Sequence, residues 1–149
     1  MISAQQIKEL RGETGAGVSD VKKALEESDG DVAKARAAIE RRLGRQADKR
    51  QGRQTSAGLV EAYIHSNARI GSLVEILCET DFVARTPGFR TLAHDIAMQA
   101  AAMGGESSDD LMAQSYIKDP QKTVGEIVRE AGGRFGEHIA IGRCARFEI

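Results

Sequence analysis

One stretch of this chain, residues 45–56, carries almost no apolar side chains. Its basic residues are Arg45, Lys49, Arg50 and Arg53. A segment with nothing to bury cannot contribute to a hydrophobic core, so the chain on either side of it must form cores of its own. We therefore predict a module over residues 1–44, a basic linker over 45–56 and a second domain over 57–149.

Residues 1–44 show helical apolar spacing interrupted by glycines. Ser3 and Gln6 form a capping-box pattern before a short first helix, which the glycines between positions 12 and 17 should end. A second helix follows as far as the break at Ser28-Asp29-Gly30. A third should begin near Val32 and end at Gly44. These patterns predict a three-helix module with a small core.

The first half of the second domain predicts a hairpin and a helix. Residues 58–65 and 69–78 are β-rich runs separated by a short turn, so we expect them to pair antiparallel. Thr86 and Pro87 are an N-cap and a first helical residue, and the apolar stripe that follows stops at Gly104-Gly105. This helix should cover one face of the sheet.

The second half contains one polar stretch and two predicted elements. Residues 105–121 indicate irregular chain with at most a short helical turn near Leu111. A helix starting near Val124 should end at Gly132-Gly133, and residues 138–147 should return as a third strand. The predicted fold class is α+β, with a small antiparallel three-stranded sheet packed with helices.

The charge distribution argues against a dedicated nucleic-acid-binding protein. Residues 1–56 hold 12 Lys or Arg against 9 Asp or Glu, whereas residues 57–149 hold 9 against 13. This asymmetry is mild, and only six aromatic residues are available for base stacking. No apolar run is long enough to span a bilayer and the N-terminus has no leader pattern, so we expect a cytoplasmic protein with no membrane partner.

The chain shows no pattern typical of an enzyme. The glycines at 15 and 17 are not followed by the Lys-Ser or Lys-Thr of a phosphate-binding loop. The three histidines lack metal-ligand spacing, and Cys78 and Cys144 have no Cys-x-x-Cys partner. We therefore expect no catalytic residue, no metal site and no cofactor.

The segment from Cys78 to Val83, Cys-Glu-Thr-Asp-Phe-Val, ends a strand-like run with a carboxylate followed by a large aromatic residue. Two interpretations are open. Asp81 could cap the next helical turn while Phe82 folds into the core. Alternatively, the pair could project together and contact a partner.

Three segments of the chain resemble elongation factor Ts. They are the N-terminal run from Ile7 through Thr14-Gly15-Ala16-Gly17 to Leu25, the Thr80-Asp81-Phe82-Val83 motif, and Gly136-Glu137-His138-Ile139-Ala140-Ile141. The resemblance implies a ubiquitin-associated-like N-terminal module and an exchange factor that releases GDP from elongation factor Tu. It also implies binding to both the GDP-bound and the nucleotide-free states of that partner.

The resemblance also implies roles for particular residues. Thr80, Asp81, Phe82 and Val83 would dislodge magnesium from the partner's nucleotide site, and the partner-docking residues would be Lys8, Gly17, Val18 and Lys22. Two features depart from the family pattern. Val18-Ser19 replaces the usual pair of methionines, and the stretch between Met103 and Thr123 is too short for the helical insertions of many relatives.

The sequence leaves other functions open. The basic linker could serve an RNA- or ribosome-associated module, and the three helices could form an adaptor without exchange activity. Because the chain has one core unit where longer relatives have two, we also expect a homodimer, with the strand 138–147 near the two-fold axis. Cys144 lies in that strand, and we expect it to stay reduced.

Overall fold

The computed structural model describes residues 1–105 and 107–149. Three helices form the N-terminal module: α1 (Ala4–Thr14), α2 (Val18–Glu27) and α3 (Val32–Asp48). The capping box of Ser3 and Gln6 is present, and Gly15 ends α1 in a left-handed conformation with φ of 69°. The buried apolar residues of this module form a core separate from that of the rest of the chain.

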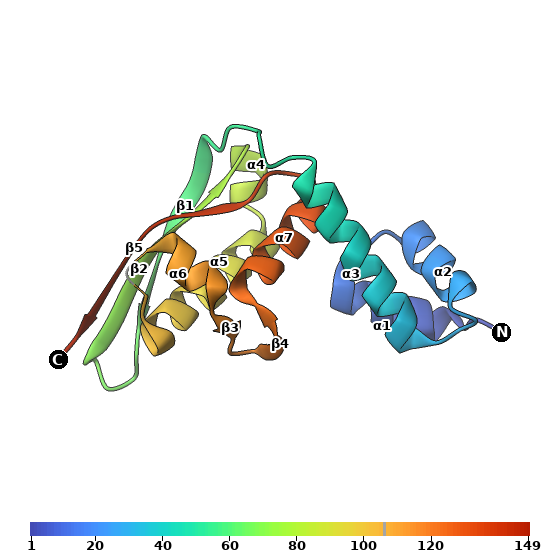
Figure 1. The fold of residues 1–149 in the computed structure, drawn as a ribbon, viewed down its shortest axis with the longest axis horizontal. Helices are drawn as coiled ribbons and strands as arrows, with labels where there is room; N and C mark the ends of the chain where they lie inside the picture. Colours follow the sequence, from blue (N-terminus) through green and yellow to red (C-terminus); the bar gives the residue numbers. More distant parts are fainter. Residues whose placement is uncertain (106) are drawn as a thin grey trace.

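The remaining residues form an α+β domain, as the sequence predicts. Its sheet consists of β1 (Ala57–Ile64), β2 (Ile70–Cys78) and β5 (Ala140–Glu148) in the order β1-β2-β5. Both pairings are antiparallel. Helix α5 (Pro87–Met103) covers one face of the sheet, with Thr86 as its N-cap (Figure 1). Its buried stripe meets the inward side chains of β2, and Ser72 Oγ donates to the Ala97 carbonyl at 2.6 Å.

The segment predicted to be irregular contains regular structure. After α4 (Asp81–Ala84) and α5, the chain forms α6 (Ser108–Ala113) and a small hairpin of β3 (Ser115–Tyr116) and β4 (Asp119–Thr123). The short helix expected near Leu111 is present as α6, but the expectation of irregular chain was wrong for the hairpin that follows it. Buried Gln99 of α5 explains the hairpin, because its amide donates to Ser115 O and accepts from Ile117 N. Such side-chain support from a distant helix leaves no local sequence pattern.

Two predicted helix ends were also wrong, for one shared reason. Helix α3 continues past Gly44 to Asp48, and α7 (Val124–Phe135) continues past Gly132 and Gly133. These glycines lie where α3 and α7 cross. A Cβ atom on Gly133 would lie 2.3 Å from the Leu43 carbonyl oxygen, and one on Gly132 would lie 3.4 Å from the Cβ of Ala47. Gly133 therefore allows the two backbones to touch, and the other glycines leave room for side chains of the facing helix, rather than ending the helices.

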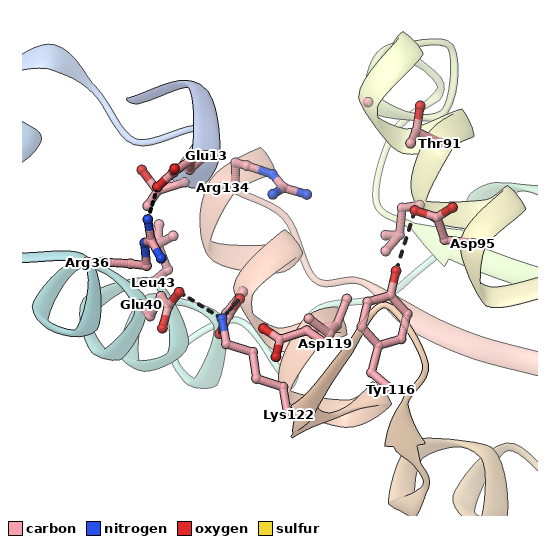
Figure 2. A pocket seen from close by; sticks show the side chains of 15 residues that line it. Glu13, Arg36, Glu40, Leu43, Thr91, Asp95, Tyr116, Asp119, Lys122 and Arg134 are labelled. Carbon is pink, nitrogen blue, oxygen red and sulfur yellow. Dashed lines mark hydrogen bonds and ion pairs between the residues drawn. The ribbon is translucent and has the colours of Figure 1, made fainter. Parts of the chain in front are cut away.

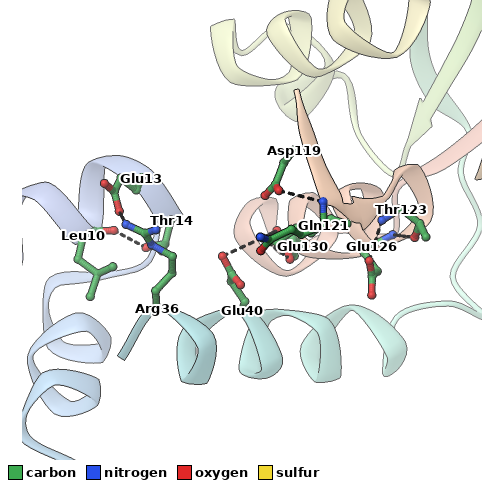
Figure 3. Close-up of polar contacts among 11 residues, drawn as sticks. Leu10, Glu13, Thr14, Arg36, Glu40, Asp119, Gln121, Thr123, Glu126 and Glu130 are labelled. Carbon is green, nitrogen blue, oxygen red and sulfur yellow. Dashed lines mark hydrogen bonds and ion pairs between the residues drawn. The ribbon is translucent and has the colours of Figure 1, made fainter. Parts of the chain in front are cut away.

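Ion pairs surround this crossing. Lys122 binds Glu40 of α3 at 2.7 Å and Glu130 of α7 at 3.0 Å, and Figure 3 shows these two carboxylates on facing helices. Burial alone would lower the pKa of Lys122, but its bonds to the two carboxylates raise it. Arg129 of α7 binds both carboxylate oxygens of Asp48. The first turn of the predicted linker thus belongs to a packed helix.

A polar cavity of about 420 Å³ lies between the N-terminal module and the α+β domain. Figure 2 shows Arg36 and Glu40 of α3 on one side of it, with Asp95 of α5 and Tyr116 of β3 on the other. Burial, followed by the nearby charge of Asp95, raises the pKa of Tyr116 to about 12.

No helix in the described residues is long and apolar enough to cross a membrane.

The crossing predicts unequal effects for two glycine-to-alanine substitutions. Gly133→Ala should lower the free energy of unfolding by about 3 kcal/mol, because its new methyl group meets backbone atoms that cannot move aside independently. Gly12→Ala on α1 has nothing within 4 Å and should raise stability by up to about 1 kcal/mol. Urea unfolding followed by circular dichroism measures both. Equal stabilities for the two variants would contradict the close crossing.

Candidate functional site

The Thr80-Asp81-Phe82-Val83 motif forms the turn between β2 and α4. Thr80 is the N-cap of α4, and its hydroxyl oxygen accepts from Val83 N at 3.4 Å. Cys78 ends β2 as a buried residue, and its thiol donates to Thr80 O at 3.2 Å. Burial, with a further contribution from the nearby Glu137 carboxylate, raises the pKa of this thiol. Cys78 therefore stays protonated and holds the turn, as a buried structural cysteine does.

The structure decides between the two interpretations of Asp81 and Phe82. Phe82 is 87% exposed and does not belong to the core, whereas the nearby Phe89 is fully buried in it. Asp81 is exposed at the first position of α4, and the capping role belongs to Thr80. Val83 is half-buried against the core. The carboxylate and the aromatic ring are thus presented to solvent from a turn that is anchored on both sides.

Sequence reasoning missed the residue that anchors this turn most directly. Glu137, which follows α7, accepts from Glu79 N at 3.1 Å and from Thr80 N at 3.0 Å through one carboxylate oxygen. Its other oxygen accepts from the Thr80 hydroxyl at 2.6 Å. Glu137 was noted within its segment, but nothing local indicates a partner more than fifty positions away in the chain.

A reciprocal contact completes the arrangement. Glu79 accepts from His138 N at 2.7 Å, so each of the two turns supplies a carboxylate to the other's backbone. Arg53 Nη1 lies 3.7 Å from Glu79 Oε1, and the carbonyl oxygen of Arg53 lies 2.7 Å from His138 Nδ1. The end of the basic segment is therefore also attached to this site.

The four predicted docking residues lie in the N-terminal module. Gly17 is the N-cap of α2, Val18 begins that helix, and Lys22 follows one turn later on the same side. Val18 and Lys22 are exposed, and Lys22 lies 3.8 Å from Glu26. Lys8 is exposed on α1. Figure 1 shows α2 well apart from α4, so the structure does not bring the docking residues and the motif together.

The loop that carries Gly17 is held by Thr14. The Thr14 hydroxyl donates to Leu10 O at 2.7 Å and accepts from Ala16 N at 3.3 Å. No group of three His, Cys, Asp or Glu side chains that could hold a metal is found in residues 1–105 and 107–149. Both candidate sites combine a hydrogen-bonded backbone with exposed side chains, a form suited to contacting another macromolecule.

A family model described as "Elongation factor TS" matches residues 4–103 and 79–149, which together span nearly the whole chain. The chain belongs to the elongation factor Ts family. Elongation factor Ts of Rubrobacter xylanophilus is 39% identical, over 97% of each chain. The protein of the same name from Caldanaerobacter subterraneus subsp. tengcongensis is also 39% identical, covering 99% of this chain and 96% of its own. That of Coprothermobacter proteolyticus is 35% identical, covering 99% and 98%.

The three elongation factor Ts proteins just named are longer than this chain. The alignments extend over 190 to 193 positions, whereas this chain has 149 residues, so each relative carries residues that are missing here. The first match to the family model ends at residue 103, where α5 ends. The name of the family identifies a translation elongation factor, which agrees with the prediction made from the sequence motifs.

Two phenylalanines near this elongation factor Ts motif should respond oppositely to truncation. Phe82→Ala should change the free energy of unfolding by no more than about 0.5 kcal/mol, because the ring is already in solvent. Phe89→Ala should lower it by about 3–5 kcal/mol, because it leaves a cavity in the core. Chemical denaturation of the two variants checks this. A large stability loss for Phe82→Ala would restore the core interpretation.

Proposed function

We propose that this chain is a guanine nucleotide exchange factor for elongation factor Tu, and that Asp81 and Phe82 disturb the partner's magnesium and phosphate site. Membership of the elongation factor Ts family supports the exchange role in general. The observation that carries the mechanism is the 87% exposure of Phe82 on a turn held by Glu137. An apolar ring kept in water by a fixed backbone is suited to entering a partner's pocket.

Bound GDP depends on geometry that tolerates little displacement. Magnesium requires near-octahedral coordination, and the phosphates are held by backbone amides and this ion. Entry of the Phe82 ring between partner helices would shift these groups, while the Asp81 carboxylate would compete for hydrogen bonds near the metal. Thr80 and Val83 act by holding the turn, through the cap and the core contact respectively. No covalent step is needed.

The free energy for release comes from the protein interface. An exchange factor binds the nucleotide-free partner more tightly than the GDP-bound partner, and linkage requires GDP to weaken the factor's binding by the same ratio. The factor therefore binds both states and has no need of a nucleotide site of its own.

The N-terminal module supplies a second contact through Lys8, Gly17, Val18 and Lys22. Gly17 and Val18 present backbone and an apolar side chain at the start of α2, and Lys22 adds a cation one turn away. Val18-Ser19 offers less flexible apolar surface than the pair of methionines usual in the family, so this contact should be weaker than in such relatives. Its role is affinity rather than displacement.

We also propose that the protein is a homodimer through the outer face of its sheet. The face of the sheet opposite α5 exposes the apolar residues Val60, Ile64, Leu73 and Phe147. Leu73 pairs with Ala62 on one side and Ala145 on the other, so the patch is continuous across the three strands. A second copy would remove this surface from water. Cys144 pairs with Val74 on the opposite, core-facing side, so its thiol points away from this interface.

The mechanism predicts slower GDP release for variants of the motif. Phe82→Ala should lose about 2 kcal/mol of interaction with the exchange intermediate, or roughly thirtyfold in the rate of release. Asp81→Ala should also slow release, whereas a merely solvated carboxylate would have almost no effect. Loss of a fluorescent GDP analogue from purified elongation factor Tu measures both rates. Wild-type release by the double variant would refute the mechanism.

Lys22→Ala separates docking from displacement in the same assay. We expect it to raise the concentration of factor needed for half-maximal release while leaving the maximal rate unchanged. Lys23→Ala is the matched control, because Lys23 is the next residue of α2 and forms the same kind of ion pair, with Glu27, that Lys22 forms with Glu26. Stable binding to elongation factor Tu without any GDP release would instead favour the adaptor function.

The dimer proposal predicts a mass near twice the monomer's 16.1 kDa in light scattering at micromolar concentration under reducing conditions. Leu73→Asp should give monomers, because it places a charge at the centre of the apolar patch. Cys144→Ser should leave the mass unchanged, because its side chain faces the core. A monomeric mass for the unmodified chain would rule the dimer out.

A further inference from the structure

We propose that Glu137 is a positioning residue for exchange, which fixes the direction in which the Asp81–Phe82 turn points. This inference rests on the proposed function and adds a residue that does not itself contact the partner. It is carried by the three hydrogen bonds that the Glu137 carboxylate accepts from Glu79 and Thr80.

The hydrogen bonds fix the backbone immediately before the contact residues. Glu79 N and Thr80 N both point to one oxygen of Glu137, which orients the two peptide planes that precede Asp81. The Thr80 hydroxyl donates to the other Glu137 oxygen and accepts from Val83 N. The Thr80 side chain therefore links Glu137 to the start of α4. With both flanks fixed, the Cα–Cβ bond of Phe82 leaves the surface in one direction, and the ring samples rotamers only about that bond.

Glu137 is itself fixed by the end of α7. Gly136 ends the helix with φ of 71°, and both Gly136 N and Glu137 N donate to Gly132 O. The neighbouring Gly133 packs on the Leu43 backbone of α3. A continuous set of contacts therefore leads from the N-terminal module through α7 to the motif.

The arrangement is stronger than an ordinary surface contact. Bonds between a carboxylate and backbone N–H groups are charge-assisted, and here they are partly shielded from water. Glu79 adds the reverse bond to His138 N, so the turn cannot rotate without breaking contacts in both directions. Removing Glu137 leaves two N–H groups and a hydroxyl to bind water instead, and the turn gains several orientations of similar energy.

The experiment compares Glu137→Ala with Glu137→Gln and Glu126→Ala. The glutamine keeps an oxygen for the two backbone N–H groups, and its amide can donate to the Thr80 hydroxyl oxygen. Glu126 is a matched control, because its carboxylate accepts from Thr123 N at 2.7 Å at the other end of α7. Two quantities are measured in the full chain: the rate of GDP release against factor concentration, and the amide hydrogen exchange of Glu79 and Thr80.

Glu137→Ala should lower the maximal release rate by about tenfold, since small misplacements of interacting groups have effects of this order or larger. It should leave the half-maximal concentration unchanged and abolish the amide protection of Glu79 and Thr80. Glu137→Gln should restore most of both, and Glu126→Ala should alter neither. If Glu137→Ala is too unstable to purify, reduced protection and a smaller slowing in Glu137→Gln support the role, and wild-type values for both overturn it.

A combined variant separates positioning from a general loss of stability. In a background that carries both Asp81→Ala and Phe82→Ala, Glu137→Ala should cause no further slowing of GDP release, although its effect on the free energy of unfolding should persist. Equal slowing in both backgrounds would overturn the positioning role. Wild-type release by Glu137→Ala alongside slow release by Phe82→Ala would overturn the same role and leave the proposed function standing. Wild-type release by Phe82→Ala would instead refute the proposed function.

Discussion

The crossing of α3 and α7 is the contact on which the rest of this structure depends. Without a side chain at Gly133, the two helices approach until Leu43 carbonyl and Cα atoms occupy the space of the missing methyl group, and Gly132 lets α7 lie against Ala47. Helices at this distance gain dispersion contacts along their backbones, and neither can slide without a steric clash. The ion pairs of Lys122 and Arg129 then fix the rotation of one helix about the other. These contacts join the core of the N-terminal module to the core of the α+β domain.

The exposed motif shows how a stable protein keeps an apolar group in water. Phe82 gains nothing from burial, and the turn that carries it is held by polar bonds from Glu137 and by the buried neighbours Cys78 and Ala84. The stability of the turn is thus largely independent of the Phe82 side chain. Under the proposed function, the residue at this position could therefore be selected for partner binding at little cost to the fold.

Much of the fold was predictable because its signals are local. The Ser3 capping box, the Thr86-Pro87 helix start and the alternation along β2 each depend on residues close together in sequence. The failures involve distant partners. Gly44, Gly132 and Gly133 look like helix ends until α3 and α7 are placed side by side, and the β3–β4 hairpin requires Gln99 of another helix. At the site, the motif was recognisable but its exposure was undecided, and the role of Glu137 depends on a pairing that only the tertiary structure shows.

The length of α3 has a consequence for any partner that touches both ends of the molecule. Its 17 residues span about 25 Å, and the crossing with α7 prevents the helix from bending away from the sheet domain. The distance between the start of α2 and the tip of α4 is therefore fixed. A partner surface can meet both only in conformations with matching spacing between its own two contact points. Selection among the partner's conformations would then follow from a distance built into the backbone, in addition to the chemistry of the side chains that make contact.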